Sequence, residues 1–150
     1  DIALLWSNES FSGDIALEAG RLVTDDGLRT AIEISLFTDA RAGDDDRLPD
    51  EGADPRGWWG NAYKPSDDAP EELGSKLWLL NREKMTAVNV ERARTYAADA
   101  LAWLKNAGIV SSLTVRAAAI GGQMIAIAVE VVRPEGPARD VYDFVWEASL

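Results

Sequence analysis

The chain contains no cysteine and no histidine among its 150 residues. Disulfides, zinc sites built from these residues, thiol nucleophiles and Ser-His-Asp triads are therefore excluded. Basic residues are also scarce, since 15 Lys and Arg stand against 26 Asp and Glu, for a formal net charge of −11. Such a chain has no basic surplus to displace the counterions of nucleic acid. We expect no nucleic-acid partner, and a basic protein surface suits the charge better.

Long hydrophobic runs are missing as well. The longest, such as "WLL" and "AIAVEVV", fall far short of the roughly 20 apolar residues that span a bilayer, so we expect no membrane partner. No signal-peptide hydrophobic segment is expected at the start. The composition, 47% hydrophobic and 27% charged, is ordinary for a globular protein. The length suits one domain, which we expect to span residues 1–150.

The sequence pattern predicts an α+β fold that starts with short extended pieces over residues 1–25. Residues 25–40 then carry a helical pattern, with Asp25 or Asp26 as a candidate N-cap. Its stripe consists of Leu28, Ala31, Ile32, Ser35 and Leu36. Residues 74–85 predict a short helix in which Ser75 is a plausible N-cap.

The clearest element is a long helix over residues 89–108. Asn89 is its expected N-cap, Glu91 suits the positive end of the dipole, and Lys105 with Gly108 suits its end. The apolar stripe consists of Val90, Ala93, Ala97, Ala100, Leu101 and Leu104.

Strands are predicted for the remainder of the chain. Residues 111–120 and 123–134 flank Gly121-Gly122, which is a two-residue hairpin signal, and residues 141–150 add a third strand. One face of the middle strand should pack on the long helix through Ile125, Ile127, Val129 and Val131. We therefore expect helices packed on one face of a small antiparallel C-terminal β-meander.

A long acidic loop separates the first two helices. Residues 39–72 hold 11 acidic and four basic residues and four of the six prolines. Loops of this length are usually functional or disordered, and we expect part of residues 44–54 to be mobile because like charges combine with few anchors. The sequence from Asp44 does not match the calcium-binding loop pattern, which needs an oxygen ligand at its fifth position and glycine at its sixth. Leu48 and Pro49 occupy these positions. No metal site is expected, and Asp44–Asp46 are interpreted as a solvated loop tip.

No pattern singles out a catalytic centre. Paired carboxylates hydrolyse glycosidic bonds when one of them is desolvated, but no spacing among the 26 acids identifies such a pair. Gly121-Gly122 lacks the strand-loop-helix context of a phosphate cradle. We expect no catalytic residue and no cofactor.

Two clusters are candidates for protein contacts. In "DPRGWWG", residues 54–60, adjacent side chains of an extended segment would point to opposite sides, so one tryptophan is expected in the core and one in an interface. Trp59 is the favoured core residue, and the core ring should contribute roughly 3–5 kcal/mol. Arg56 lies two residues before Trp58, and arginine and aromatic side chains are the usual anchors of protein interfaces. Arg56, Trp58 and Trp59 are therefore candidate partner-binding residues.

The second cluster is "NREK", residues 81–84. It is either a solvated helix face with an internal ion pair or a contact surface in which Arg82 meets a carboxylate of a partner. Arg82, Glu83 and Lys84 are accordingly candidate partner-binding residues.

An ordered series of motifs gives a family resemblance. The series "TAIEISLFTDARA", "DPRGWWGNAY", "GSKLWLLNREKMT" and "YAADALAWLKNAGIV" resembles the phage Mu-type small baseplate protein family, from about Asp14 to Trp146. Members of that family are similar to the T-even lysozyme-like baseplate wedge protein. Within the resemblance, "TDARA" looks like the relatives' helix-ending threonine-to-arginine segment, which makes Asp39 and Arg41 candidates for orienting the loop.

The resemblance implies a structural component of a contractile phage tail baseplate. Such a protein joins the hub and tube to the wedges and templates the first sheath ring, in a virion tail assembled in the host bacterial cytoplasm. Its implied partners are other wedge and hub proteins and sheath subunits, which connect by strand exchange, and it is present in multiple copies. The T-even relatives' Trp-Glu-Pro-Arg stretch corresponds here to "WLKNAGIV", residues 103–110, where only Trp103 matches, so its contact is not carried over.

Two alternatives remain beside this structural role. The acidic clusters and the lysozyme-like label suggest a peptidoglycan hydrolase that uses paired carboxylates. The acidic loop also suits an adaptor that binds a basic protein partner.

Overall fold

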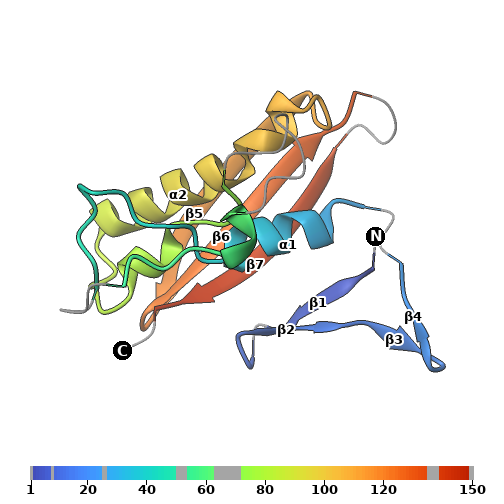
Figure 1. Cartoon of the computed structure of the whole chain (residues 1–150), viewed down its shortest axis with the longest axis horizontal. Helices are drawn as coiled ribbons and strands as arrows, with labels where there is room; N and C mark the ends of the chain where they lie inside the picture. The colour runs from blue at the N-terminus through green and yellow to red at the C-terminus, as the bar shows by residue number, and fades with distance from the viewer. Residues whose placement is uncertain are drawn as a thin grey trace.

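The C-terminal part of the chain, after α2 Ala87–Asn106, is a three-stranded antiparallel meander in the order β5-β6-β7 (Figure 1). Its strands are β5 Ser112–Gly121, β6 Met124–Val132 and β7 Asp140–Glu147. The structure is a computed structural model that describes residues 2–7, 9–24, 27–49, 54–62, 72–134 and 139–148. The predicted meander is confirmed.

The predicted β5–β6 hairpin is confirmed, but its loop lies one residue later than the glycine pair indicates. Gly121 pairs with Met124, so Gly122 and Gln123 form the two-residue loop. The φ angles of Gly121 and Gly122 are 108° and 58°, in the left-handed region where a Cβ is strained.

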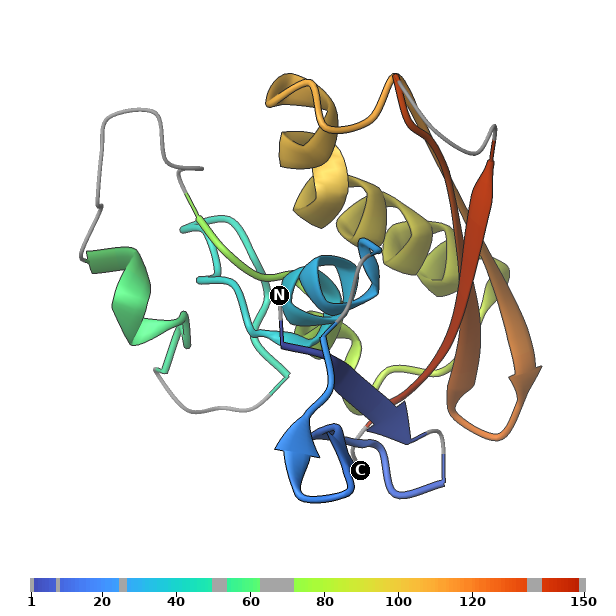
Figure 2. The same ribbon diagram turned by 90° about the vertical axis from the view of Figure 1, so that its right-hand side faces the viewer.

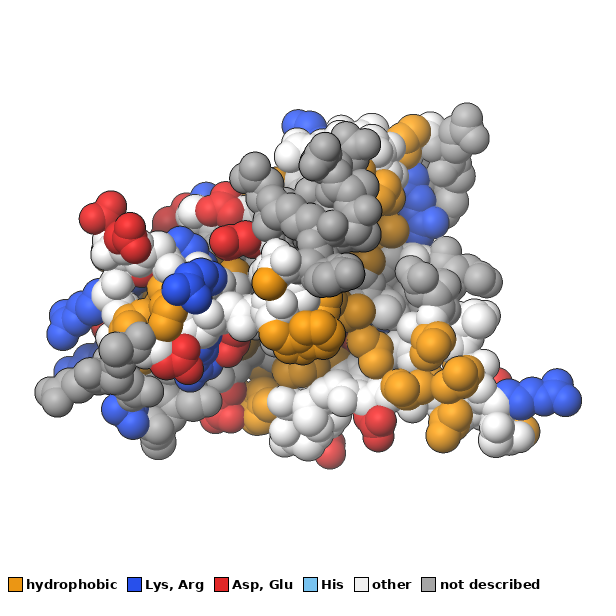
Figure 3. Space-filling view, in the orientation of Figure 1, with side chains coloured by type: hydrophobic (Ala, Val, Ile, Leu, Met, Phe, Trp, Pro, Cys, Tyr) orange, Lys and Arg blue, Asp and Glu red, His pale blue; other side chains and the backbone are white. Residues whose placement is uncertain are grey.

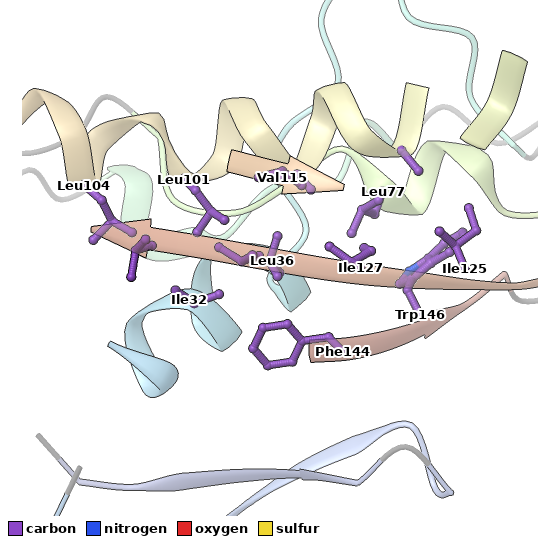
Figure 4. Close-up of a cluster of buried hydrophobic side chains, with 14 of the residues drawn as sticks. Ile32, Leu36, Leu77, Leu101, Leu104, Val115, Ile125, Ile127, Phe144 and Trp146 are labelled. Carbon is purple, nitrogen blue, oxygen red and sulfur yellow. The ribbon is translucent and has the colours of Figure 1, made fainter. Parts of the chain in front are cut away.

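The core lies between the sheet and two helices, α1 Arg29–Phe37 and α2 Ala87–Asn106. Figure 2 shows both helices on the same side of the sheet. The inward face of β6, formed by Ile125, Ile127, Val129 and Val131, is at most 1% exposed, as expected. The α2 stripe buries Leu101 and Leu104 against this face, while Ile32 and Leu36 of α1 lie near Phe144 of β7 (Figure 4). The α+β prediction is therefore confirmed.

The N-terminus of α1 is not capped as expected. The N-cap residue is Leu28, which makes no side-chain cap hydrogen bond, and Asp25 and Asp26 lie outside the described residues. The backbone N–H of Leu28 instead donates to the Tyr142 hydroxyl of β7 at 3.2 Å. A tertiary contact therefore replaces the local cap, which sequence spacing cannot reveal.

The cap of α2 lies three residues before the expected one. The Thr86 side chain accepts a hydrogen bond from the backbone N–H of Asn89. Asn89 itself is buried in the first turn, where its Nδ2 donates to the Lys84 carbonyl at 2.9 Å. Both residue types favour caps, and the helix extends back to the first of the two.

The short helix predicted over residues 74–85 is present only as a single-turn 3-10 helix, η2 Leu77–Leu80. All four of its side chains are buried, which is incompatible with a helix that has a solvated face. The N-cap is Lys76 rather than Ser75. The Ser75 hydroxyl donates to the Leu36 carbonyl at 2.6 Å and accepts from the Leu77 N–H at 3.3 Å.

The N-terminal segment forms a ribbon of short strands, as the extended pattern predicts. Its strands are β1 Leu4–Ser7, β2 Ser12–Ile15, β3 Leu17–Glu18 and β4 Arg21–Leu22. Trp6 attaches the ribbon to the core, because its ring stacks on Phe37 at 3.8 Å and its indole N–H donates to the Val145 carbonyl at 3.3 Å.

The ribbon carries apolar side chains into solvent. Figure 3 shows hydrophobic side chains on the surface where Figure 1 places this ribbon. The exposed apolar residues of the ribbon are Ile2, Leu5, Ile15, Leu17 and Leu22. Grouped exposure of this kind marks a contact surface more often than isolated exposed residues do. Among the described residues, no helix is both long and apolar enough to cross a membrane.

The position of Leu101 in the core gives a stability prediction. Replacing this fully buried residue (Leu101→Ala) should lower the free energy of unfolding by about 2–5 kcal/mol, because a cavity remains. The matched variant Val88→Ala, on the same helix at 70% exposure, should change it by less than about 0.5 kcal/mol. Urea unfolding followed by circular dichroism measures both, and equal losses would contradict this core.

Candidate functional site

The chain after α1 is fixed against the segment before η2. The Ser75 N–H donates to the Thr38 carbonyl at 2.8 Å and the Ala40 N–H donates to the Ser75 carbonyl at 2.9 Å, so the two segments form a short parallel bridge at Asp39. Gly74 permits this approach, since a Cβ there would lie 2.6 Å from the Thr38 oxygen. Asp39 is thus held in place directly after the helix.

Arg56 connects Asp39 to Trp78 of η2. Its guanidinium lies 2.7 Å from the Asp39 carboxylate and 4.5 Å from the centre of the Trp78 ring. The indole N–H of Trp78 in turn donates to the Ala40 carbonyl at 2.8 Å. We call Asp39, Arg56 and Trp78 the arginine clamp. Because the ion pair is about 40% exposed, it contributes modestly to stability, and the cation–π contact with Trp78 adds a second point at which Arg56 is held.

Local backbone geometry supports the arginine clamp. Arg56 has a φ of 52°, and its N–H donates to the Asp54 carboxylate at 2.9 Å. The Ala42 N–H donates to the Pro55 carbonyl at 2.9 Å, so the two segments lie side by side. Gly57, at a φ of 109°, sits against Arg41, whose Cβ would be 3.1 Å from a Cβ at position 57. Arg41 therefore packs on the backbone that precedes the tryptophans.

Trp58 and Trp59 directly follow this supported backbone, and their rings lie side by side at the surface. Trp58 is 40% exposed and Trp59 is 82% exposed, and their ring centres are 5.6 Å apart. The prediction of one core ring, with Trp59 favoured, is wrong. The segment is not extended: Trp59 begins the 3-10 helix η1 Trp59–Ala62, and this turn brings the neighbouring rings together.

Gly60 and Asn61 fix the far side of the pair. The Trp58 ring covers Gly60 so closely that a Cβ there would lie 2.3 Å from it. The Asn61 side chain makes two hydrogen bonds to the backbone of Leu73, accepting its N–H at 3.0 Å and donating to its carbonyl at 3.3 Å. We call these two hydrogen bonds between Asn61 and Leu73 the amide clamp. The sequence predictions identified neither Asn61 nor Trp78, whose roles depend on residues distant in sequence.

The acidic loop is anchored at Asp46, not solvated throughout. Its carboxylate accepts from the Lys76 ammonium at 2.6 Å and from the Gly43 N–H at 2.8 Å. The hydrogen bond from Lys76 holds the pKa of Asp46 below its ordinary value, and the same bond raises the pKa of Lys76. Residues 44–49 thus have the anchor that the sequence interpretation lacked, while residues 50–53 lie outside the described residues.

The "NREK" residues lie apart from a helix face. They follow η2 in a turn, where Arg82 has a φ of 64° and the Glu83 N–H donates to the Leu80 carbonyl at 3.1 Å. The Lys84 carbonyl accepts from Thr86 and Asn89, so its backbone supports the start of α2. The helix-face interpretation is wrong because η2 ends at Leu80.

A hollow of about 300 Å³ lies beside the arginine clamp. Asp39, Arg56 and Trp78 line it together with Asn81, whereas the ribbon and β7 contribute Trp6 and Trp146. Within the described part of the chain, no group of three or more Asp or Glu side chains is arranged to hold a metal ion. The site is a structured surface of aromatic and paired charged groups, a composition typical of protein contacts.

The Asp46–Lys76 pair gives a pH prediction. Asp46→Asn should lower the free energy of unfolding at pH 7 by up to about 1 kcal/mol, since the pair is partly exposed. The lowered pKa of Asp46 means that this stabilisation is present above its ordinary value of 3.8 and is lost as the pH falls through the lowered pKa. The raised pKa of Lys76 means that it is also lost as the pH rises above 10.5 through the raised pKa.

Urea unfolding of the Asp46→Asn and wild-type chains across this pH range measures the effect. Asp45→Asn, an exposed neighbour with the same charge change, is the control and should show little difference from wild type. A deficit in Asp46→Asn that persisted unchanged into acid would contradict a role for the charge.

Comparison with known proteins identifies the family. A family model described as "Phage protein GP46" matches residues 28–138. The chain is 48% identical over 136 residues to "Baseplate protein gp46" of Escherichia phage Mu, covering 91% of this chain and 89% of that protein. It is 38% identical, with the same coverage, to "Mu-like prophage FluMu protein gp46" of Haemophilus influenzae. The chain therefore belongs to the phage protein GP46 family.

Proposed function

We propose that this protein is a structural component of a contractile phage tail baseplate. Its 48% identity to a protein named as a baseplate protein, over most of both chains, is the observation that carries the proposal. The whole chain then acts as one wedge-like domain of the virion tail, assembled in the host cytoplasm.

The tryptophan pair is the proposed contact with neighbouring baseplate proteins. An indole at 82% exposure costs solvation free energy unless a partner covers it, and tryptophan and arginine are common interface anchors. The arginine clamp and the amide clamp fix the chain on either side of Trp58 and Trp59, so little backbone conformational entropy is lost on binding. Arg41 and the "NREK" residues Arg82, Glu83 and Lys84 are proposed as further contacts around this surface.

The finer role is to link the hub and tube to the wedges and to template the first sheath ring. The edge position of β7 supports this role, because an edge strand presents backbone groups to which an added strand can bond, apart from the Val145 carbonyl that accepts from Trp6. Its partners would be wedge and hub proteins and sheath subunits, with several copies of this chain in each particle.

Replacing the exposed indole separates assembly from folding. Trp59→Ala should leave the free energy of unfolding within about 0.5 kcal/mol of wild type but reduce incorporation into baseplates. Trp58→Ala should destabilise more, since its ring covers Gly60, yet by less than the ~3–5 kcal/mol of a fully buried ring. Thermal melts and co-assembly with neighbouring baseplate proteins measure both. Val88→Ala, an exposed apolar residue of α2, is the assembly control. Normal incorporation of Trp59→Ala would refute the contact.

The structural role also predicts an absence of hydrolytic activity. The purified chain should not clear peptidoglycan from about pH 4 to about pH 8, the range in which perturbed carboxyl groups titrate. A turbidity assay with hen lysozyme as the positive control measures this. Turnover that vanished on replacing one acidic residue would favour the hydrolase alternative.

A further inference from the structure

The meander has a second face, which points away from the core. Because the inward positions of β6 are Ile125, Ile127, Val129 and Val131, its intervening residues point outward. In Figure 2 both helices lie on the opposite side of the sheet. At the centre of the outward face lie three rows, set by the strand register: Thr114–Glu130–Val141, Arg116–Ala128–Asp143 and Ala118–Ala126–Val145.

The outward face is hollow in the middle. Ala118, Ala126 and Ala128 form the floor of an open hollow of about 320 Å³, which Arg116 and Asp143 border. Sheets usually pack about 10 Å apart, and alanines at the centre allow a closer approach. A second layer could therefore rest on this floor while longer side chains at the borders reach across.

The centre of this face carries positive as well as negative groups, although the chain as a whole is strongly acidic. Arg116 and Asp143 lie on opposite edge strands in one row, and both are exposed. In the next row, Glu130 is paired with Arg139 and lies 3.8 Å from Arg116. Glu147, which pairs with Met124 at the end of the strands, adds a third acid, so two basic and three acidic groups occupy this face of a molecule whose net charge is −11. A second copy therefore meets less repulsion here than a uniformly acidic surface would give.

We propose that two copies of this chain pack through this face about a two-fold axis that runs along β6. Such an axis sets β5 of each copy over β7 of the other. Arg116 then meets the Asp143 of the second copy, and symmetry repeats the contact. In the adjacent row, Ala118 lies opposite the larger Val145, so small and large side chains are matched.

The charge pattern selects this axis over the alternative. An axis in the same plane but across the strands would place β5 over β5, so that equivalent side chains of the Arg116 row repel. The selected axis does bring the two Glu130 residues close together. Their carboxylates are already paired with Arg139 and approached by Arg116, which reduces that repulsion.

Charge reversal tests the pairing directly. The full 150-residue chain is analysed by sedimentation equilibrium at about 0.15 M ionic strength, where a Debye length of about 8 Å screens the long-range repulsion. The wild type should approach twice the monomer mass as its concentration rises. Arg116→Asp and Asp143→Arg alone should each remain monomeric, because like charges then meet. The double variant should regain the dimer, because the exchanged charges pair again.

Matched variants control for charge and folding. Arg94→Asp at a partly exposed position of α2 and Asp45→Arg at an exposed position of the acidic loop carry the same charge changes and should dimerise like wild type. Circular dichroism melts verify that every variant is folded.

A wild type that is monomeric at all concentrations would overturn the proposal. So would a dimer insensitive to the single reversals, or a double variant that stays monomeric. Incorporation of Arg116→Asp into baseplates distinguishes these failures from the function proposed above, since that function rests on the tryptophan surface and not on this face.

Discussion

Burial of one face of β6 is the constraint on which the rest of the molecule depends. Ile125, Ile127, Val129 and Val131 are covered by α2 and α1, and this cover fixes where each helix lies. The end of α1 then determines the position of Asp39, and η2, which packs on the same core, determines that of Trp78. The exposed tryptophans are therefore placed by a core that they do not enter.

The sequence alone predicts those helices and strands whose buried side chains recur at a regular spacing. The alternation in β6 and the helical stripe ending at Leu104 depend only on side-chain spacing, and both are confirmed. The caps were less predictable, because Thr86 and Asn89 have similar propensities and Leu28 is satisfied by a distant tyrosine. Helix boundaries are predicted poorly where two neighbouring residues are both good caps, or where the hydrogen-bond partner of the helix end is distant in sequence.

The candidate surface was predicted only in part. Trp58, Trp59, Arg56 and Asp39 were recognised by type and by resemblance, but their geometry depends on a 3-10 turn and on a stack against Trp78. Asn61 resembles any loop asparagine in the sequence. Its role is visible only when Leu73 lies opposite it, since neither hydrogen bond is local.

The amide clamp acts as a non-covalent crosslink between two segments that are distant in sequence. Asn61, shortly after the tryptophans, is hydrogen-bonded to the backbone of Leu73, and Gly74 continues from there into the bridge at Asp39. The backbone that carries the indoles is therefore connected to the end of α1 by two routes, one through Arg56 and one through Asn61. Two attachments of this kind lower the conformational entropy of the segment between them, which carries both indoles.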